Sequence, residues 1–313
     1  MRIDRSMLGY GAGLLLLLLA PLFIYPVLVV KVLCFAIFAC AYNLLLGYTG
    51  LLSFGHAAFF GLAAYITGHV LKVWELPTLV GLLAGTLGAA ALGWLVGALA
   101  IRRQGIYFAM ITLALAQLLY FLLQQAPFTG GDDGMQGIPR GSLFGIDLSN
   151  DHNLYYLVVA VFVAAFWLIQ RAIDSPFGQV LKAIRENEPR VVSLGYDVAR
   201  YKLLAFVLSA GLAGLAGATK ALVFNFASLS DSHWHMSGEV VLMTLLGGMG
   251  TVFGPVVGAG LIVVLQNELA EKVGSLINVV MGVIFVVCVL AFRRGIVGEG
   301  LALYRSMLGE KTR

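Results

Sequence analysis

Apolar residues recur along the chain in blocks of about 17–25 residues, the length that a helix needs to cross the hydrocarbon layer of a bilayer. Short polar stretches separate the blocks. The pattern therefore predicts an all-α protein, a polytopic transmembrane helical bundle of about 8–10 membrane segments. We interpret the whole chain, 1–313, as one transmembrane domain. The predicted spans are 8–25, 28–47, 54–71, 79–100, 104–125, 154–171, 203–226 and 276–292.

One further apolar stretch, 239–267, is interrupted in its middle by the glycine-rich string Leu246–Pro255. Each flanking piece of about 12 residues reaches only about halfway across a bilayer. A broken or re-entrant helix pair is expected here, and one long tilted helix with packing glycines is the alternative. The pattern F-G-x5-G occurs at Phe54–Gly61 and again at Phe253–Gly260. Transporters are commonly built from internal repeats with broken helices, although a glycine-rich chain also produces such matches by chance.

Charge placement predicts the orientation of the chain. Basic residues are concentrated at Arg102–Arg103, in the loop 174–202 and in the tail 293–313, whereas the loops 126–153 and 227–238 contain a single arginine between them. Because the cytoplasmic loops of membrane proteins are enriched in Lys and Arg, the three basic regions are expected in the cytoplasm and the other two loops in the periplasm. Both termini are then cytoplasmic.

The composition agrees with a membrane protein, since 60% of the residues are hydrophobic, 12% are charged and 38 are glycine. Soluble domains contain about 25% charged residues. Small residues also let membrane helices approach closely. The net charge of +4 does not indicate nucleic-acid binding, because the basic residues lie at the ends of apolar blocks. Membrane lipids are the expected surroundings.

The largest basic loop predicts two short helices. Ser175 can cap a helix that begins at Pro176. That helix should end near Glu188, because the residue before Pro189 disfavours the helical region. A second helix should follow, with Gly195 suited to the position after its end. Such a pair beside the membrane is either a docking surface for a cytosolic partner or a loop whose charges only set the topology.

Four segments, spread over nearly the whole chain, carry a resemblance to a known family. They are N-L-L-L-G-Y-T-G-L-L-S-F-G-H-A-A-F-F-G (Asn43–Gly61), T-G-G-D-D-G-M-Q-G-I-P (Thr129–Pro139), A-I-R-E-N-E-P-R-V-V-S-L-G-Y-D-V-A-R-Y-K-L-L-A-F-V-L-S-A-G-L-A-G-L-A-G-A (Ala183–Ala218) and L-G-G-M-G-T-V-F-G-P-V-V-G-A (Leu246–Ala259). The chain resembles the permease subunits of branched-chain amino acid ABC transporters, and most closely the LivM-type member of the pair.

The resemblance implies an ABC importer permease in the bacterial inner membrane, with no cofactor and no enzymatic activity of its own. It also implies three kinds of partner: a second permease subunit, expected to be a LivH-type paralogue, cytosolic ATP-binding subunits, and a periplasmic substrate-binding protein. In that family the cytoplasmic loop contacts the ATP-binding subunit. This assigns ATPase docking to Glu186, Glu188, Arg190 and Gly195. Pro189 departs from the family pattern, which has a less rigid residue there.

Candidate residues for a substrate pathway lie at the two glycine-rich breaks. A helix that begins at His56 near the midplane would present free N–H groups and a positive dipole end to a substrate carboxylate. The alternative is that Ser53 caps the helix and His56 is a packed core residue. Polar residues inside spans, such as Asn43 and Thr244, either bond between helices or touch substrate. The candidate pathway residues are Asn43, Ser53, Gly55, His56, Thr244, Gly247 and Gly248.

No metal site is predicted. The segment Asp231–Glu239 holds four side chains that can bind metal, but their spacing is not diagnostic, and a polar rim that meets a partner protein is preferred. Lys220, late in the span 203–226, is expected to extend its ammonium group outward to the interface.

The leading interpretation is a permease subunit that translocates Leu, Ile or Val, with the exact substrate left open. A permease of the same fold for urea or a short-chain amide is one alternative. A stand-alone secondary transporter or channel is another, although no span carries the central Asp or Glu expected for ion coupling. The sequence has no G-x-x-x-x-G-K-[ST] motif, so ATP hydrolysis is expected from a separate subunit.

Overall fold

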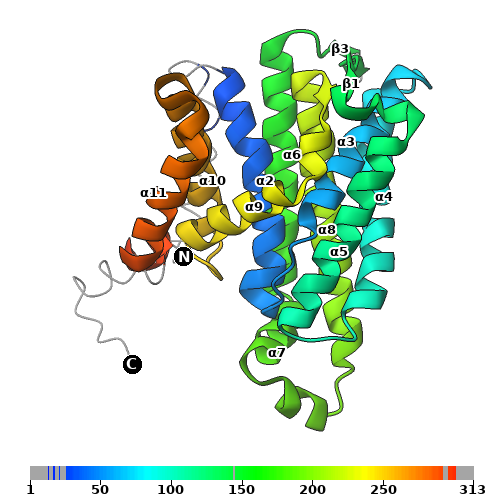
Figure 1. Ribbon diagram of the computed structural model, residues 1–313. Helices are drawn as coiled ribbons and strands as arrows, with labels where there is room; N and C mark the ends of the chain where they lie inside the picture. The colour runs from blue at the N-terminus through cyan, green and yellow to red at the C-terminus, as the bar shows by residue number, and fades with distance from the viewer. Residues whose placement is uncertain are drawn as a thin grey trace, which may run out of the picture.

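The computed structural model describes residues 13, 17, 21, 26–143, 145–291 and 295–300. In these ranges the molecule is a bundle of helices with two short β-ribbons at one end (Figure 1). The prediction of an all-α polytopic bundle is confirmed. The helices are α2 (Pro26–Thr49), α3 (His56–Lys72), α4 (Thr78–Ala100), α5 (Ile106–Gln125), α6 (Asp151–Asp174), α7 (Pro176–Ser193), α8 (Val198–Phe224), α9 (Trp234–Gly247), α10 (Gly254–Val273) and α11 (Ile277–Ala291).

Among the described residues, five helices are long and apolar enough to cross a membrane: α2, α4, α5, α6 and α8. Each predicted span from 28–47 onward corresponds to a helix, and the ends differ by a few residues. α8 shows the largest shift, because the Asp197 side chain accepts a hydrogen bond from the backbone N–H of Arg200 and so starts the helix before the apolar block begins. Most of the predicted span 8–25 and most of the tail 293–313 lie outside the described residues.

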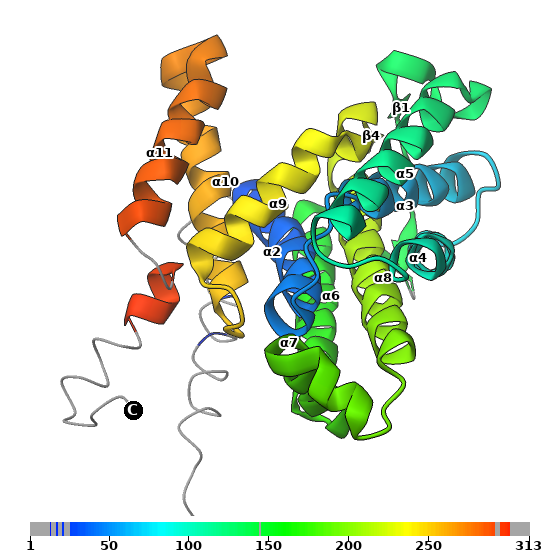
Figure 2. The same ribbon diagram turned by 60° about the horizontal axis from the view of Figure 1, so that its bottom comes forward.

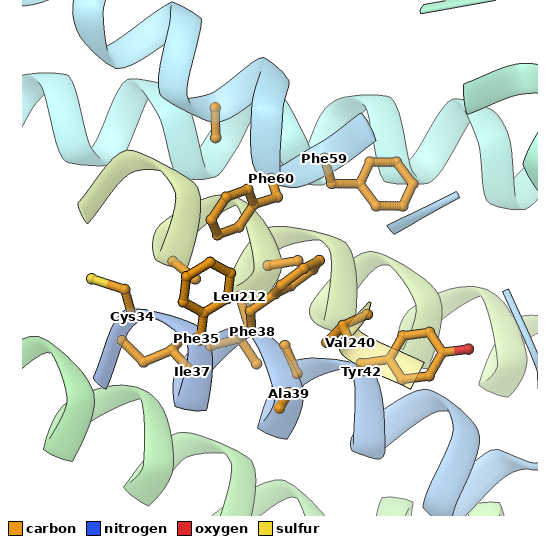
Figure 3. Close-up of a cluster of buried hydrophobic side chains, with 14 of the residues drawn as sticks. Cys34, Phe35, Ile37, Phe38, Ala39, Tyr42, Phe59, Phe60, Leu212 and Val240 are labelled. Carbon is orange, nitrogen blue, oxygen red and sulfur yellow. The ribbon is translucent and has the colours of Figure 1, made fainter. Parts of the chain in front are cut away.

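α2 lies at the centre of the bundle and packs against α6, α8, α9 and α10 (Figure 1). Every side chain from Leu33 to Thr49 is buried, as expected of a helix that is apolar on all sides. On the face toward α3, the Phe60 ring stacks on Phe35 and Phe38 at centroid distances of 6.0 and 4.6 Å (Figure 3). These aromatic contacts fix α3 against the central helix.

α3, α4 and α8 approach one another closely through small residues. A Cβ atom on Gly217 of α8 would overlap the carbonyl oxygen of Phe60 on α3, and one on Gly85 of α4 would lie 2.8 Å from the carbonyl oxygen of Ala63. Without a hydrophobic driving force between helices in lipid, such close packing is a main source of helix association. The glycines that marked the chain as a membrane bundle therefore act at these contacts.

Two loops, 50–55 and 248–253, interrupt the bundle, the first between α2 and α3 and the second between α9 and α10. The predicted break within 239–267 is confirmed, and one long helix is excluded. The expected half length of the second piece is wrong: α9 has 14 residues, but α10 has 20. α10 continues through a polar turn, in which Lys272 pairs with Glu268 one turn earlier at 3.6 Å.

The loops 126–153 and 227–238 meet at one end of the bundle, and α7 lies at the opposite end (Figures 1 and 2). Arg140 fastens the first loop to the end of α8, because its guanidinium donates to the side chain of Asn225 at 3.0 Å and to the carbonyl oxygen of Val223 at 2.9 Å. The orientation predicted from charge requires the loops 126–153 and 227–238 at one end of the bundle and the basic loop 174–202 at the other.

The short elements are β1 (Met135–Gln136) paired antiparallel with β4 (Phe226–Ala227), β2 (Ser142–Leu143) paired with β3 (Ile146–Asp147), and the 3₁₀ turns η2 (Pro127–Thr129), η3 (Gly131–Asp133), η4 (Leu229–Ser232) and η5 (Gly274–Leu276).

Candidate functional site

The first break places His56 at the start of α3 in a fully buried position. Its ring lies edge-on to Tyr42 of α2, Phe59 of α3 and Phe206 of α8, with centroids 5.0, 5.4 and 5.6 Å away. Two hydroxyl groups contact its nitrogens: Nδ1 lies 3.1 Å from Ser53 Oγ and Nε2 lies 2.9 Å from Ser209 Oγ. In this structure His56 is therefore a packed and fully hydrogen-bonded residue.

The hydrogen bonds around His56 assign its tautomer. Ser209 donates its one hydroxyl proton to the carbonyl oxygen of Ala41 at 2.6 Å, so it can only accept from His56. Nε2 must then carry a proton, and in the neutral form of the ring Nδ1 accepts from Ser53. His56 thereby joins the loop 50–55 to α2 and α8.

Two backbone N–H groups at the N-terminus of α3 already have hydrogen-bond partners. Ala57 N donates to Ser237 Oγ of α9 at 2.9 Å, and Ser53 Oγ accepts from the backbone N–H of Gly55 at 3.2 Å. Gly55 itself packs on α5, where an added Cβ would lie 2.7 Å from the carbonyl oxygen of Thr112. A substrate carboxylate at this helix end would have to displace Ser237. The pathway role of Ser53, Gly55 and His56 stays a prediction.

Asn43 connects α2 to the second break across 208 positions of sequence. This buried α2 side chain donates from Nδ2 to the carbonyl oxygen of Thr251 at 2.9 Å, and its Oδ1 accepts from the backbone N–H of Gly250 at 2.9 Å. Both amide functions of Asn43 are used, so the side chain replaces the backbone partners that the loop 248–253 lacks. The sequence identified Asn43 as a polar residue inside a span, but its partners could not be read from the pattern.

The remaining pathway candidates are contacts between helices in this structure. Thr244 is fully buried, and its hydroxyl donates to the carbonyl oxygen of Val240 at 2.8 Å. Gly247 lies where α9 crosses α10, and a Cβ there would overlap the carbonyl oxygen of Gly254. Gly248 has a φ of 125°, which turns the chain out of α9. Whether any of them lines a pathway remains a prediction.

The predicted pair of helices in the loop 174–202 is confirmed within α7. Ser175 caps its start by accepting from Gly178 N. Asn187 leaves helical geometry, with φ −157° and ψ 87°, and its side chain accepts from the backbone N–H of Arg190 at 3.1 Å. Asn187 therefore caps the second short helix, one residue before the expected boundary. Gly195 follows that helix with a φ of 86°, as predicted for the position after a helix end.

The four docking candidates divide into two groups. Glu186, Arg190 and Gly195 are exposed. They lie just before the kink at Asn187, in the second short helix of α7, and in the turn that follows it. Glu188 is instead held within the chain, because its carboxylate accepts from Lys202 Nζ at 2.7 Å and from Gln104 Nε2 at 3.0 Å. It ties α7 to α8 and to the loop before α5, so it is better placed to orient α7 than to meet a partner.

Lys220 does not extend to the interface, and that prediction is wrong. Its ammonium group pairs with Asp231 of η4, and the two side chains are 16% and 2% exposed. It also lies 5.8 Å from the centre of the Phe60 ring. The buried carboxylate of Asp231 therefore holds the lysine inside the bundle. The prediction considered only the span 203–226, and Asp231 lies in the loop after it.

The segment Asp231–Glu239 has no metal arrangement, since no three of the described His, Cys, Asp or Glu side chains are placed to share an ion. His233 caps α9 by accepting from the backbone N–H of His235 at 3.4 Å, and its ring stacks on that of His235 at 6.0 Å. Burial, and then the neighbouring His235, lower the pKa of His233. The segment serves as the capped start of α9.

Sequence reasoning missed Arg185 of α7. Its Nη1 donates to the carbonyl oxygen of Gly47 at the end of α2. A Cβ on Gly50 would lie 3.2 Å from Arg185 Cγ, and one on Gly250 would lie 3.1 Å from Arg185 Nη1. Arg185 stood among several basic residues of a charged loop, and no signal in the sequence separated it from them.

Comparison with known proteins agrees with this architecture. A family model described as "branched-chain amino acid transport system / permease component" matches residues 26–290. The high-affinity branched-chain amino acid transport system permease protein LivM of Escherichia coli (strain K12) is 30% identical over 258 positions, covering 73% of this chain and 60% of LivM. The permease protein BraD of Pseudomonas aeruginosa is 23% identical over 284 positions, covering 85% of this chain and 92% of BraD.

A shorter match, 30% identical over 135 positions and 42% of this chain, is to the autoinducer 2 import system permease protein LsrC of Klebsiella pneumoniae. The chain spans about 60% of the length of the LivM protein that it matches. No solved structure matches it.

Proposed function

The chain belongs to the family of permease components of branched-chain amino acid transport systems, and from this premise we propose that it is the membrane-spanning subunit of an ABC importer for Leu, Ile or Val. The family match across residues 26–290 carries the proposal. The names of LivM and BraD, both branched-chain amino acid transport permease proteins, support the substrate class. None of the relatives named above is described as a urea or amide permease or as a stand-alone transporter.

The exposed surface of α7 and its following turn, formed by Glu186, Arg190 and Gly195, supports docking of a cytosolic ATP-binding subunit. Glu186 and Arg190 present opposite charges on a rigid, capped helix pair, and Glu188 anchors that pair to α8 through Lys202. A rigid element can transmit a partner's movement, whereas a flexible loop would absorb it. In this proposal the α7 end faces the cytoplasm of a bacterial inner membrane, as do both termini, and the opposite end meets a periplasmic binding protein. A LivH-type paralogue is the second permease.

The test is transport by the assembled system. The permease, its paralogue and the ATP-binding subunits are reconstituted in proteoliposomes with the binding protein, and uptake of radiolabelled Leu is measured with Ile, Val and urea as competitors. ATP-dependent uptake of Leu that Ile and Val reduce is expected. The matched control carries an ATP-binding subunit with an inactivated nucleotide site. Uptake by the permease alone, driven by an ion gradient, would contradict the proposal, and uptake of urea in place of Leu would favour the alternative substrate.

A further inference from the structure

α7 contacts the last turn of α2 through two residues that lie on one face of the helix. Lys182 and Arg185 are three positions apart, the spacing of neighbours on a helix surface. Lys182 Nζ lies 5.7 Å from the centre of the Tyr48 ring, and Arg185 Nη1 donates to the carbonyl oxygen of Gly47. The last carbonyl groups of a helix have no partner within it and carry partial negative charge, so a guanidinium group is well matched to them.

The same guanidinium group reaches the second break. Gly250 approaches Arg185 so closely that an added Cβ would lie 3.1 Å from Nη1, and Gly50 approaches its Cγ in the same way at 3.2 Å. The two glycines have nearly equal backbone geometry, with φ values of 76° and 78°. They also occupy equivalent places in the strings L-L-G-Y-T-G (45–50) and L-L-G-G-M-G (245–250). Arg185 therefore lies between two matching turns, each of which follows the C-terminal end of a helix.

Asn43, a buried residue of α2, holds the second of these turns to the central helix. It holds Gly250 and Thr251 through both of its amide functions, and Gly47 packs directly on it. The loop 248–253 is thus fixed to α2 by Asn43 and lies against Arg185 on the α7 side. Movement of either turn must disturb this junction of Asn43, Gly47, Gly50, Arg185 and Gly250.

We propose that Arg185 is a positioning residue that makes the two glycine turns move together when α7 moves. The inference rests on the proposed function in one respect, namely that a partner displaces α7 during transport. If α7 shifts, Arg185 either carries the end of α2 and the loop 248–253 with it or releases both. One side chain then controls the breaks before α3 and α10, and it does so without contact with a substrate.

The first test needs no transport. Met249, in the loop 248–253, is exposed, and a Met249→Cys variant of the full chain is labelled with a maleimide and followed by mass spectrometry. Arg185→Ala should increase the labelling rate about three- to tenfold, because loss of a hydrogen bond from a charged donor changes an opening equilibrium by about that factor at a solvent-accessible site. Arg185→Lys keeps the charge but not the planar guanidinium group, so its labelling rate should lie between those of the parent Met249→Cys chain and of Arg185→Ala.

The matched control is Arg200→Ala, since Arg200 is exposed and pairs with Asp197 at the start of its own helix. It should leave the labelling rate unchanged. An unchanged rate in Arg185→Ala, or an equal increase in Arg200→Ala, overturns the proposal.

The second test uses the assembled complex. Arg185→Ala, Gly50→Ala and Gly250→Ala should retain the ATP-binding subunit and its ATP hydrolysis while uptake falls, whereas Gly238→Ala, where an added Cβ meets nothing within 4 Å, should behave as the parent. Loss of the ATP-binding subunit from Arg185→Ala would place Arg185 in the docking surface and overturn the proposal. If the parent complex carries no branched-chain amino acid, the proposed function fails, and the labelling result still decides the role of Arg185.

Discussion

Gly217 and Gly211 lie on the same helix, α8, and differ in what stands opposite them. A Cβ on Gly217 would overlap the carbonyl oxygen of Phe60, whereas one on Gly211 would meet Ala90 Cβ at an ordinary 3.4 Å. Gly217→Ala should therefore destabilise the protein by about 1–3 kcal/mol through overpacking. Gly211→Ala should be neutral or stabilising by up to about 1 kcal/mol, because alanine favours the helix. Thermal unfolding of both variants in one detergent measures the difference, and equal midpoints would contradict the close contact of α3 and α8.

The buried pair of Lys220 and Asp231 gives a second prediction at the residue scale. Lys220→Met leaves a buried carboxylate without its cation, and a loss of about 3–5 kcal/mol of stability is expected. The double variant Lys220→Met with Asp231→Leu removes both charges and should recover most of that loss. Unfolding midpoints of the single and double variants are compared in detergent. A single variant as stable as the parent would show that the pair is not desolvated in the folded protein.

Local residue roles were predictable where the chemistry is local. Ser175 and Gly195 were identified because a cap and a left-handed position after a helix depend on a few neighbouring residues. Asn43 and Arg185 act through partners far away in sequence, and Lys220 is held by a carboxylate on a separate loop. No periodicity connects such positions, so their contacts appear only in the folded chain.

At the scale of elements, the span pattern predicted which segments are helices because a membrane leaves the backbone few other options. It misjudged α10, since the apolar block ends before the helix does and the polar turn with Glu268 and Lys272 continues it. It also placed the break of α7 one residue late, because the capping side chain of Asn187, and not Pro189 alone, decides where the second helix starts.

Variants of α7 should distinguish side chains that dock the ATP-binding subunit from the side chain that holds α7 against α8. Reversal of the exposed charges, Glu186→Lys with Arg190→Glu, should reduce co-purification of the ATP-binding subunit and leave thermal stability unchanged. Glu188→Gln should lower stability by about 1–3 kcal/mol, because Lys202 is buried against that carboxylate. Glu186→Gln is the control for loss of an acid on the same helix. If the double reversal keeps normal co-purification and uptake, the charges of α7 serve only as a topology signal.

For the whole molecule, the two ends of the bundle predict a pattern of chemical labelling. Ser142 and Ser230 are exposed at the end that holds the β-ribbons, and Ser193 is exposed at the α7 end. Single cysteines at Ser142 and Ser230 should react with a membrane-impermeant maleimide in intact spheroplasts, and a cysteine at Ser193 should react only after permeabilisation. The reverse pattern would invert the proposed orientation.

The hydrogen bond between Asn43 and Thr251 can form only late in the synthesis of the chain. The two residues are 208 positions apart, and at about 5–20 residues per second the ribosome needs about 10–40 seconds to pass from one to the other. During that interval α2 is in the membrane with an amide side chain whose final partners do not yet exist. A nascent chain that stops before residue 250 should therefore remain attached to insertion machinery or be degraded, and release of the finished bundle depends on the residues from 250 onward.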